Sequence, residues 1–206
     1  AFIIPQLLNP SMTEIAVGAQ EEADRLGLCL SVLQLTEKPG YQSYNLKLLE
    51  HFPFDGVMFF HSSVDPEEFL RHCPRKDIPI VVHRVDIHSP YVACIQTDRE
   101  GGMYQATKYL LSLNHTKIAF LSGPPEWELS KVRLHGIQRA FDESGIGFQA
   151  HCHRWGFPTI DWGFQVTSSL LRLPDNERPT AILAFNDLMA IGALHAIRNA
   201  GVRVPE

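Results

Sequence analysis

The sequence predicts an α/β protein built from two similar halves, each folded around a parallel sheet. Short apolar runs alternate with longer amphipathic segments along the whole chain. Strands that alternate with helices imply crossover connections, and crossover connections imply parallel sheets. The alternation also restarts near Gln96-Thr97-Asp98. We therefore expect two units, an N-terminal one over residues 1–96 and a C-terminal one over residues 97–206.

The first half opens with an apolar strand over residues 1–4, closed by Pro5. A helix is expected over 12–26, because Met12, Ile15 and Ala19 recur at helical spacing and Gly27 follows the last turn. The rest of this half reads as strands over 29–35, 56–60, 80–83 and 92–95, and helices over 42–51 and 66–72.

The second half repeats the pattern with longer helices. Gly145 and Gly201 follow two of them, at the position where a helix commonly ends. The expected helices span 99–113, 127–144, 161–173 and 187–200, and the expected strands span 117–121, 151–155 and 181–184. Neither a strong internal repeat nor a low-complexity linker is visible.

Composition and charge exclude several classes of protein. The 206 residues are 45% hydrophobic and 20% charged, which is ordinary for a globular domain and excludes disorder. The 18 Lys and Arg against 23 Asp and Glu give a net charge of −5, which argues against phosphate binding by this part of the chain. No apolar run approaches the roughly 20 residues of a membrane span, and no signal peptide is visible.

The cysteines indicate a reducing compartment, so we expect a cytoplasmic protein. None of the four stands in a C-x-x-C pair, and Cys29 and Cys94 lie in apolar, strand-like runs, where buried free thiols are expected. His151-Cys152-His153 resembles a metal cluster. Alternation along a strand, however, would place the cysteine on the opposite face from the histidines, so no metal site is predicted.

Catalytic and cofactor motifs are absent from the sequence. Neither a phosphate-binding G-x-x-x-x-G-K-[ST] loop nor a G-x-G-x-x-G fingerprint is present, and H-E-x-x-H and G-x-S-x-G are also missing. We therefore predict neither an enzyme nor a bound cofactor.

Polar residues follow several predicted strands at the point where each strand ends. In open α/β sheets, ligands bind beyond these carboxyl ends. Guanidinium, carboxylate and amide groups beside aromatic rings suit a polyhydroxylated ligand, because they bond adjacent hydroxyls while a ring covers the apolar face of a sugar. These residues are Asn9, His61-Ser62, His83-Arg84, Gly123-Pro124-Pro125 and Asn186-Asp187.

Several ordered motifs at the right separations resemble the LacI/GalR family of bacterial repressors. They are the helix-to-strand segment 109–124, Arg133-Leu134-His135-Gly136-Ile137 with Ala140-Phe141, Pro179-Thr180-Ala181-Ile182, Asn186-Asp187-Leu188-Met189-Ala190, and Gly201-Val202-Arg203-Val204-Pro205. Weaker matches, among them Asp55-Gly56-Val57, Ile78-Pro79-Ile80 and Asp98 with Gly101-Gly102, extend the resemblance over almost the whole chain.

The resemblance implies the effector-binding domain of a transcriptional repressor. Such a domain has two Rossmann-like lobes, similar to type I periplasmic sugar-binding proteins, and forms a homodimer. A small effector, a sugar or sugar phosphate, binds in the cleft between the lobes and changes how an attached helix-turn-helix head binds operator DNA. That head is absent from this sequence, and the C-terminal lobe is expected to be incomplete.

Two other functions fit a protein of this class. A periplasmic solute-binding component of a transporter would share the fold, although four unpaired cysteines count against it. A small α/β enzyme is the other alternative, and the detection of catalytic turnover of a substrate would distinguish it from a binding domain.

The resemblance also implies binding residues, each with a structural alternative. Arg133 matches an arginine that reaches the ligand, or it pairs on the surface with Glu128 or another acidic residue. Asn186 and Asp187 match a ligand-facing pair, or they cap a helix. Phe157 lies near the position of a stacking aromatic, where Trp155 or Trp162 could serve instead.

In the first half, Asn9 and Met12 match positions that line the pocket, and Met12 fits helix core equally well. Family members often carry a carboxylate where this chain has His83-Arg84. Arg84 therefore either favours an anionic ligand or pairs with Asp86. Phe60 and His61 are expected to shape the same pocket.

Overall fold

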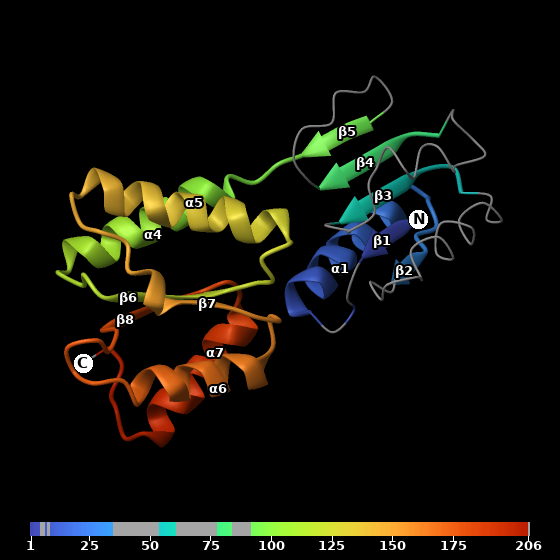
Figure 1. Ribbon diagram of the computed structural model, residues 1–206. Helices are drawn as coiled ribbons and strands as arrows, with labels where there is room; N and C mark the ends of the chain where they lie inside the picture. The colour runs from blue at the N-terminus through green and yellow to red at the C-terminus, as the bar shows by residue number, and fades with distance from the viewer. Residues whose placement is uncertain (5–6, 8, 35–53, 61–77, 84–91, 206) are drawn as a thin grey trace. The chain divides into compact units, whose positions relative to one another are not determined.

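The computed structural model describes residues 1–4, 7, 9–34, 54–60, 78–83 and 92–205 of the chain (Figure 1). The chain divides into two compact units, Ala1–Thr97 and Asp98–Glu206, which are described separately. Every strand pairing in both sheets is parallel among the described residues. The predicted α/β class with parallel sheets is therefore confirmed.

The first unit contains a five-stranded sheet in the order β2-β1-β3-β4-β5. Apolar side chains cover both of its faces, because Ile3 packs with Val57 and Phe59 on one side while Phe2 and Ile4 pack against a helix on the other. The strands are β1 (Phe2–Ile4), β2 (Val32–Gln34), β3 (Val57–Phe60), β4 (Ile80–His83) and β5 (Val92–Ile95).

Helix α1 (Pro10–Arg25) begins two residues before the predicted start at Met12. Asn9 caps it, since its side-chain oxygen accepts a hydrogen bond from Ser11 N at 3.1 Å, and Pro10 supplies a first residue that needs no hydrogen-bond partner. The helix ends at Leu26 and Gly27, where Gly27 has a φ of 71°. That left-handed conformation favours glycine.

The predicted strand over 29–35 was too long at its beginning. Leu28 N still donates to Ala23 O of α1, and pairing with β1 begins only at Val32, so Cys29 lies in the connection. Its predicted burial was wrong, because Cys29 is exposed, whereas Cys94 is half-buried in β5 against the core. The helices predicted over 42–51 and 66–72 lie outside the described residues, as does Cys73.

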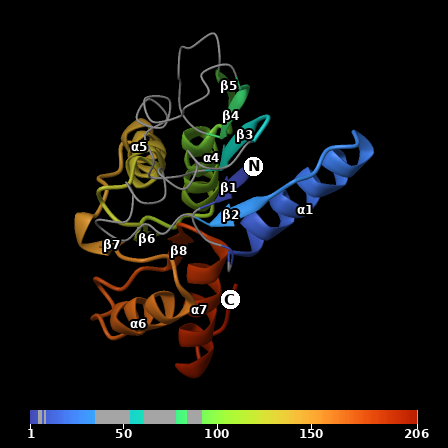
Figure 2. The same ribbon diagram turned by 90° about the vertical axis from the view of Figure 1, so that its right-hand side faces the viewer.

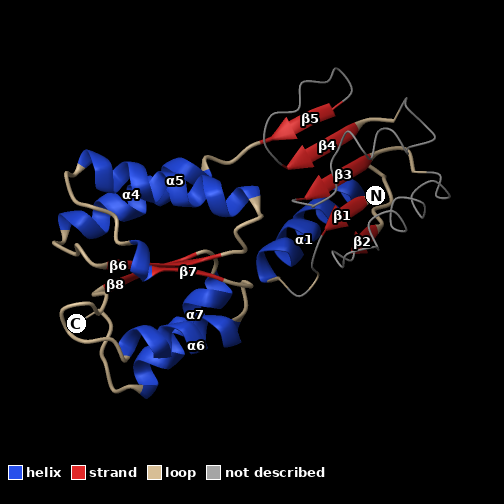
Figure 3. Cartoon of the chain, in the orientation of Figure 1, coloured by secondary structure: helices blue, strands red, loops and turns tan. Residues whose placement is uncertain are grey.

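The second unit has helices on both faces of its sheet, whose strand order is β7-β6-β8. Helices α4 (Arg99–Ser112) and α5 (Glu128–Glu143) lie on one face, and α6 (Ile160–Leu171) and α7 (Asp187–Asn199) lie on the other (Figures 2 and 3). The strands are β6 (Ile118–Ser122), β7 (His153–Trp155) and β8 (Ala181–Ala184).

Strand β6 is buried along its whole length, and its side chains alternate between the two helical layers. Ile118 and Phe120 pack with Ile137 of α5, whereas Ala119 and Leu121 pack against α6 and α7. A central parallel strand is covered on both sides in this way, which explains its uninterrupted apolar sequence.

Glycines let the helices of each pair approach until their backbones touch. A Cβ at Gly192 of α7 would lie 2.0 Å from Ile160 O of α6, and one at Gly163 of α6 would lie 2.4 Å from Met189 O of α7. A Cβ at Gly136 of α5 would likewise lie 2.2 Å from the carbonyl oxygen of Glu100 in α4. Only glycine fits these positions without moving a helix.

The His-Cys-His segment is not a continuous strand, as the sequence had suggested. A 3₁₀ turn (Ala150–Cys152) precedes β7, so His151 is exposed, Cys152 is buried and only His153 belongs to the strand. Within the described ranges, no three His, Cys, Asp or Glu side chains gather closely enough to hold a metal ion. Likewise, no helix of the described residues is long and apolar enough to cross a membrane.

His153 is a partly buried histidine inside an aromatic cluster. Its ring stacks on Phe120 with 5.4 Å between centroids and lies 4.0 Å from the Trp155 ring. Its Nε2 atom is buried without a hydrogen-bond partner in the described structure. Burial, with a smaller contribution from Arg154, lowers the pKa of His153 to about 4.

We predict that acid weakens the second unit through His153. The unfolded chain takes up a proton near the ordinary pKa of 6.5, but the native state does so only near 4. Neutral His153 should therefore contribute fully to the free energy of unfolding above pH 6.5. This contribution should be lost as the pH drops towards 4, and the loss should be about 2 kcal/mol after allowance for partial exposure. Urea denaturation between pH 7 and 4 measures this. His153→Phe should flatten the profile, and His195→Gln at an exposed position should not; equal slopes for both variants would contradict the prediction.

We predict that Gly192→Ala destabilises the second unit by about 2–3 kcal/mol, because the new methyl group would force α7 away from the backbone of α6. Gly102→Ala in α4 is the matched control, since no atom lies within 4 Å of the added Cβ. That change should stabilise the unit by about 0.5–1 kcal/mol. Thermal or urea melts compare the two, and equal effects would show that the α6–α7 contact is not tight.

Candidate functional site

The loops that follow β6, β7 and β8 lie at one edge of the second unit's sheet, because all three strands are parallel. The loop over 123–127 leads into α5, the loop over 156–159 into α6, and Phe185-Asn186 into α7. Each helix thus begins at the edge where ligands bind in open α/β sheets. Four of the predicted site residues lie in or just after these loops: Phe157, Asn186, Asp187 as the first residue of α7, and Arg133 in the second turn of α5.

Arg133 is fixed in the second turn of α5 by the residue that follows β8. Its Nη1 donates a hydrogen bond to the carbonyl oxygen of Phe185, and its guanidinium carbon lies 4.2 Å from the centroid of the Phe185 ring. The predicted alternative, a surface pair with Glu128, is not what the structure shows, because Glu128 pairs with Lys131 at 3.4 Å. Arg133 therefore connects α5 to the start of α7.

The charge on Arg133 is held in a partly desolvated position. The pKa of Arg133 is lowered to about 10, mainly by burial and also by repulsion from Arg99, while Asp187 acts in the opposite direction. Because pH 7 is about three units below this pKa, the side chain remains protonated at neutral pH. In the described part of the chain, no carboxylate lies within 4 Å of the Arg133 guanidinium, so it makes no direct ion pair there.

For Asn186 and Asp187 the sequence left two roles open, helix capping and ligand contact. Asn186 caps α7, since its Oδ1 accepts a hydrogen bond from Met189 N at 3.0 Å. Asp187, the first residue of the helix, is exposed and close enough to Arg133 to affect its pKa. A carboxylate and a guanidinium thus lie near one another at the sheet edge, available to hydroxyl groups.

Phe157 is the most exposed of the three aromatic candidates on the loop after β7, with 65% of its surface accessible against 38% for Trp155. Trp162 packs against the core beneath α6 and α7 instead, and a Cβ at Gly156 would lie 1.9 Å from it. Phe157 therefore offers a free ring face at the same edge as Arg133, and Trp162 has a structural role.

In the first unit, Asn9 is half-buried and caps α1, and Met12 packs against the core of Phe2, Ile4 and Ala16. Both still follow β1 at the carboxyl edge of that sheet. Phe60 is the last residue of β3. His61 and Arg84 lie outside the described residues, so their assignment stays a prediction.

The sequence reading missed Ser130, a buried residue of α5 one turn before Arg133. Its hydroxyl has no hydrogen-bond partner among the described residues, and neither has that of Ser122 at the end of β6. A Cβ at Gly123 would lie 2.8 Å from Ser130 Oγ and 2.9 Å from the Phe185 ring, so Gly123 packs closely against both residues. The i, i+3 spacing of Ser130 and Arg133 could have indicated that they share a helix face.

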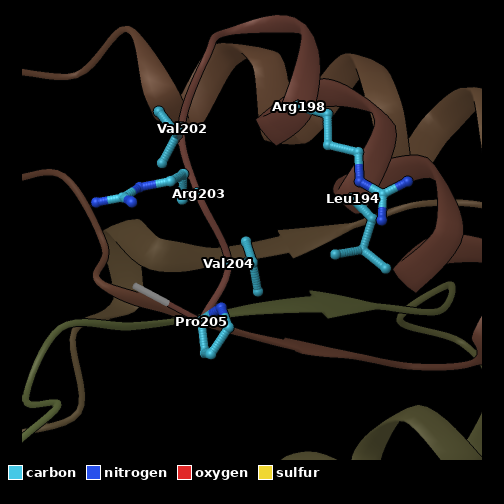
Figure 4. A pocket seen from close by; sticks show the side chains of 6 residues that line it. All are labelled: Leu194, Arg198, Val202, Arg203, Val204 and Pro205. Atoms are coloured by element: carbon cyan, nitrogen blue, oxygen red, sulfur yellow. The ribbon is translucent and has the colours of Figure 1, made fainter.

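A hollow of about 390 Å³ lies away from these residues, at the C-terminal end of α7. Figure 4 shows side chains from the last turns of α7 and from the segment after it. Because a helix that follows a parallel strand runs back along the sheet, this hollow lies towards the edge opposite Arg133. Its lining residues are Leu194, Arg198, Val202, Arg203, Val204 and Pro205.

Comparison with known proteins gives the same family as the sequence motifs. A family model described as periplasmic binding proteins and sugar binding domain of LacI family matches residues 1–206. The HTH-type transcriptional regulator DegA of Bacillus subtilis is 30% identical over 208 residues, and the HTH-type transcriptional repressor PurR of Photobacterium profundum is 30% identical over 209. Each match covers 100% of this chain but 61% of the relative, so the chain spans less than two thirds of these proteins.

Solved structures share the fold at lower identity. A LacI family transcriptional regulator from Lactobacillus casei with bound glucose has a TM-score of 0.85 at 21% identity, covering 99% of this chain and 76% of that chain. A LacI family regulator from Enterococcus faecium with bound ribose has a TM-score of 0.81 at 22% identity, covering 100% and 74%.

We predict that the capping role of Asn186 can be measured apart from any ligand. Asn186→Ala leaves the amide of Met189 without its acceptor and should cost about 1 kcal/mol of stability, whereas Asn186→Ser keeps a capping oxygen and should cost a few tenths. Urea denaturation of the ligand-free protein separates the two variants. Equal stabilities would mean that the cap contributes nothing.

Proposed function

The chain belongs to the family of periplasmic binding proteins and LacI-type sugar-binding domains, and we propose that it is the sugar-sensing part of a bacterial transcriptional repressor. The observation that carries this proposal is that Arg133, Asp187 and the exposed ring of Phe157 come from segments that follow the three strands of one parallel sheet at its carboxyl edge, with Asp187 close enough to Arg133 to act on its pKa.

These groups suit a small polyhydroxylated ligand. The Arg133 guanidinium carries several N–H donors in a fixed plane, and the exposed Asp187 carboxylate supplies acceptors, so adjacent hydroxyls of a sugar can bond to both. The exposed ring of Phe157 can cover the apolar face of the sugar. Nothing in this set requires a cofactor or a covalent step, which favours binding over catalysis.

The similar proteins support a regulator more than a transport component. Both relatives named above are HTH-type transcriptional regulators. The two solved regulators of the same fold hold glucose and ribose, so these sugars are the first probes to test. A periplasmic solute-binding protein remains the second candidate, because the family includes such proteins.

In the proposed mechanism, the ligand contacts Arg133, Phe157, Asn186 and Asp187 of the second unit. The sequence motifs also assign ligand binding to five residues of the first unit, Asn9, Met12, Phe60, His61 and Arg84. A ligand that binds one conformation of the protein better shifts the population towards that conformation. The shift reaches operator DNA through a helix-turn-helix head outside these 206 residues, in a cytoplasmic homodimer.

We predict that Arg133→Gln weakens sugar binding between about 10-fold and 100-fold, the loss expected for hydrogen bonds to a charged group. Isothermal titration calorimetry with D-glucose and D-ribose measures this. Arg172→Gln, an exposed arginine at the end of α6, is the matched control and should bind like wild type. An unchanged affinity in Arg133→Gln would remove Arg133 from the site.

The regulatory part of the proposal has its own test. Full-length protein should retain a small set of genomic DNA fragments in a pull-down, and the sugar that binds in calorimetry should change the amount retained. Sugar binding without any specific DNA retention would favour the solute-binding alternative.

A further inference from the structure

We propose that Ser130 is a further ligand-binding residue of the candidate site, and that its hydroxyl group donates a hydrogen bond to one particular oxygen atom of the sugar. This inference rests on the proposed function and adds to it a residue that determines which sugar is preferred. The sequence motifs do not single out Ser130, whereas the contacts at the beginning of α5 do.

The hydroxyl of Ser130 is buried without a partner. Ser130 is completely buried, and among the described residues no group forms a hydrogen bond with its Oγ atom. A buried hydroxyl inside a helix can bond to the carbonyl oxygen four residues earlier, as that of Thr107 does to Met103 O at 2.7 Å. Ser130 is only the third residue of α5, so the residue four positions earlier lies outside the helix. An unpaired buried hydroxyl is costly, which makes a ligand atom the partner to test.

The same hydroxyl lies at the beginning of a helix that no side chain caps. Trp127 makes no side-chain capping bond, and the carboxylate of Glu128 in the first turn pairs with Lys131 instead. Within the described part of the chain, the backbone N–H groups of Glu128 and Leu129 form no hydrogen bond. Because helical side chains lean towards the N-terminus, the Ser130 hydroxyl and these N–H groups are donors in one place. An acceptor oxygen of a ligand suits them.

Ser130 stands one turn before Arg133 on the same face of α5, and residues at this spacing have Cβ atoms about 5–6 Å apart. Both lie near the Phe185 ring: Gly123, against which Ser130 Oγ packs, also packs against this ring, and the Arg133 guanidinium lies 4.2 Å from the ring centroid. A sugar ring bonded to Arg133 is therefore large enough to reach the start of α5. A rotation of the short Ser130 side chain completes the contact, and such rotamer changes are common on binding.

A single buried donor makes the site selective for one oxygen atom of the ligand. A sugar with an acceptor oxygen at the right position pairs the Ser130 hydroxyl, whereas the corresponding deoxy sugar leaves that hydroxyl unpaired. A site built in this way rejects an analogue that lacks the oxygen more strongly than a site lined by apolar side chains does. Ser130 should therefore affect the choice between closely related sugars more than it affects the stability of the fold.

Calorimetry with the full-length protein tests this with parent sugars and their deoxy analogues. The probes are D-glucose with its 2-deoxy, 3-deoxy and 6-deoxy analogues, and D-ribose with 2-deoxy-D-ribose. Wild type should bind at least one analogue about 3-fold to 10-fold more weakly than its parent. Ser130→Ala should bind the parent more weakly by a similar factor but bind that analogue as wild type does, so that the preference for the parent is lost.

Thr167→Val is the matched control, because Thr167 of α6 is also completely buried with a hydroxyl that has no partner among the described residues. This variant removes the hydroxyl at nearly constant volume and should keep both the affinity and the preference. Thermal melts without sugar should place Ser130→Ala and Thr167→Val within about 2 °C of wild type or above it, since each loses an unpaired buried hydroxyl.

The outcomes separate the two proposals. If Ser130→Ala binds every sugar as wild type does, or weakens parents and analogues by the same factor, the contact with Ser130 is wrong while the sugar-sensing proposal stands. A loss of preference in Thr167→Val as large as that in Ser130→Ala would also overturn the contact. If wild type binds none of these sugars, both proposals are contradicted.

Discussion

The burial of β6 on both faces is the constraint on which the rest of the second unit depends. A five-residue strand with no exposed side chain must be covered by helices above and below, and parallel neighbours then require every helix to run back along the sheet. All helices of the unit therefore begin at the same edge. The candidate site is a consequence of this arrangement, because Arg133, Phe157 and Asp187 come from segments that only a parallel sheet would bring to one edge.

Close packing of the helices fixes the positions of α4, α5 and the start of α7 relative to one another. Because Gly136 allows α5 to touch the backbone of α4, the position of Arg133 along its helix is fixed relative to Arg99. The hydrogen bond from Arg133 to Phe185 O then fixes α5 relative to the start of α7. The guanidinium thus links α5 to the residue before α7 and remains charged near the exposed edge, so the proposal assigns both stability and ligand recognition to Arg133.

Periodicity predicted the helices and strands of the second unit to within about two residues at most ends, because the apolar pattern of a buried strand or amphipathic helix is strong. It failed at Cys29 and at His151, where a hydrogen-bonded turn occupies the first residues of the expected strand. Hydrophobicity does not report such local hydrogen bonds. The capping role of Asn186 was one of two open alternatives, since Asn is favoured there on chemical grounds. Ser130 was missed because its position depends on a contact with Gly123, in the loop before α5, that apolar periodicity does not report.

The acidic composition of the chain is compatible with a cationic group in its candidate site, because the two act over different distances. A net charge of −5 is spread over 206 residues and is largely screened by salt beyond about 10 Å. The field at a partly desolvated edge depends on the nearest charges, and those that act on Arg133 there are Arg99 and Asp187. The composition therefore argues against an extended polyanion as a partner of this surface, whereas the binding of a small ligand depends on the individual groups at the sheet edge.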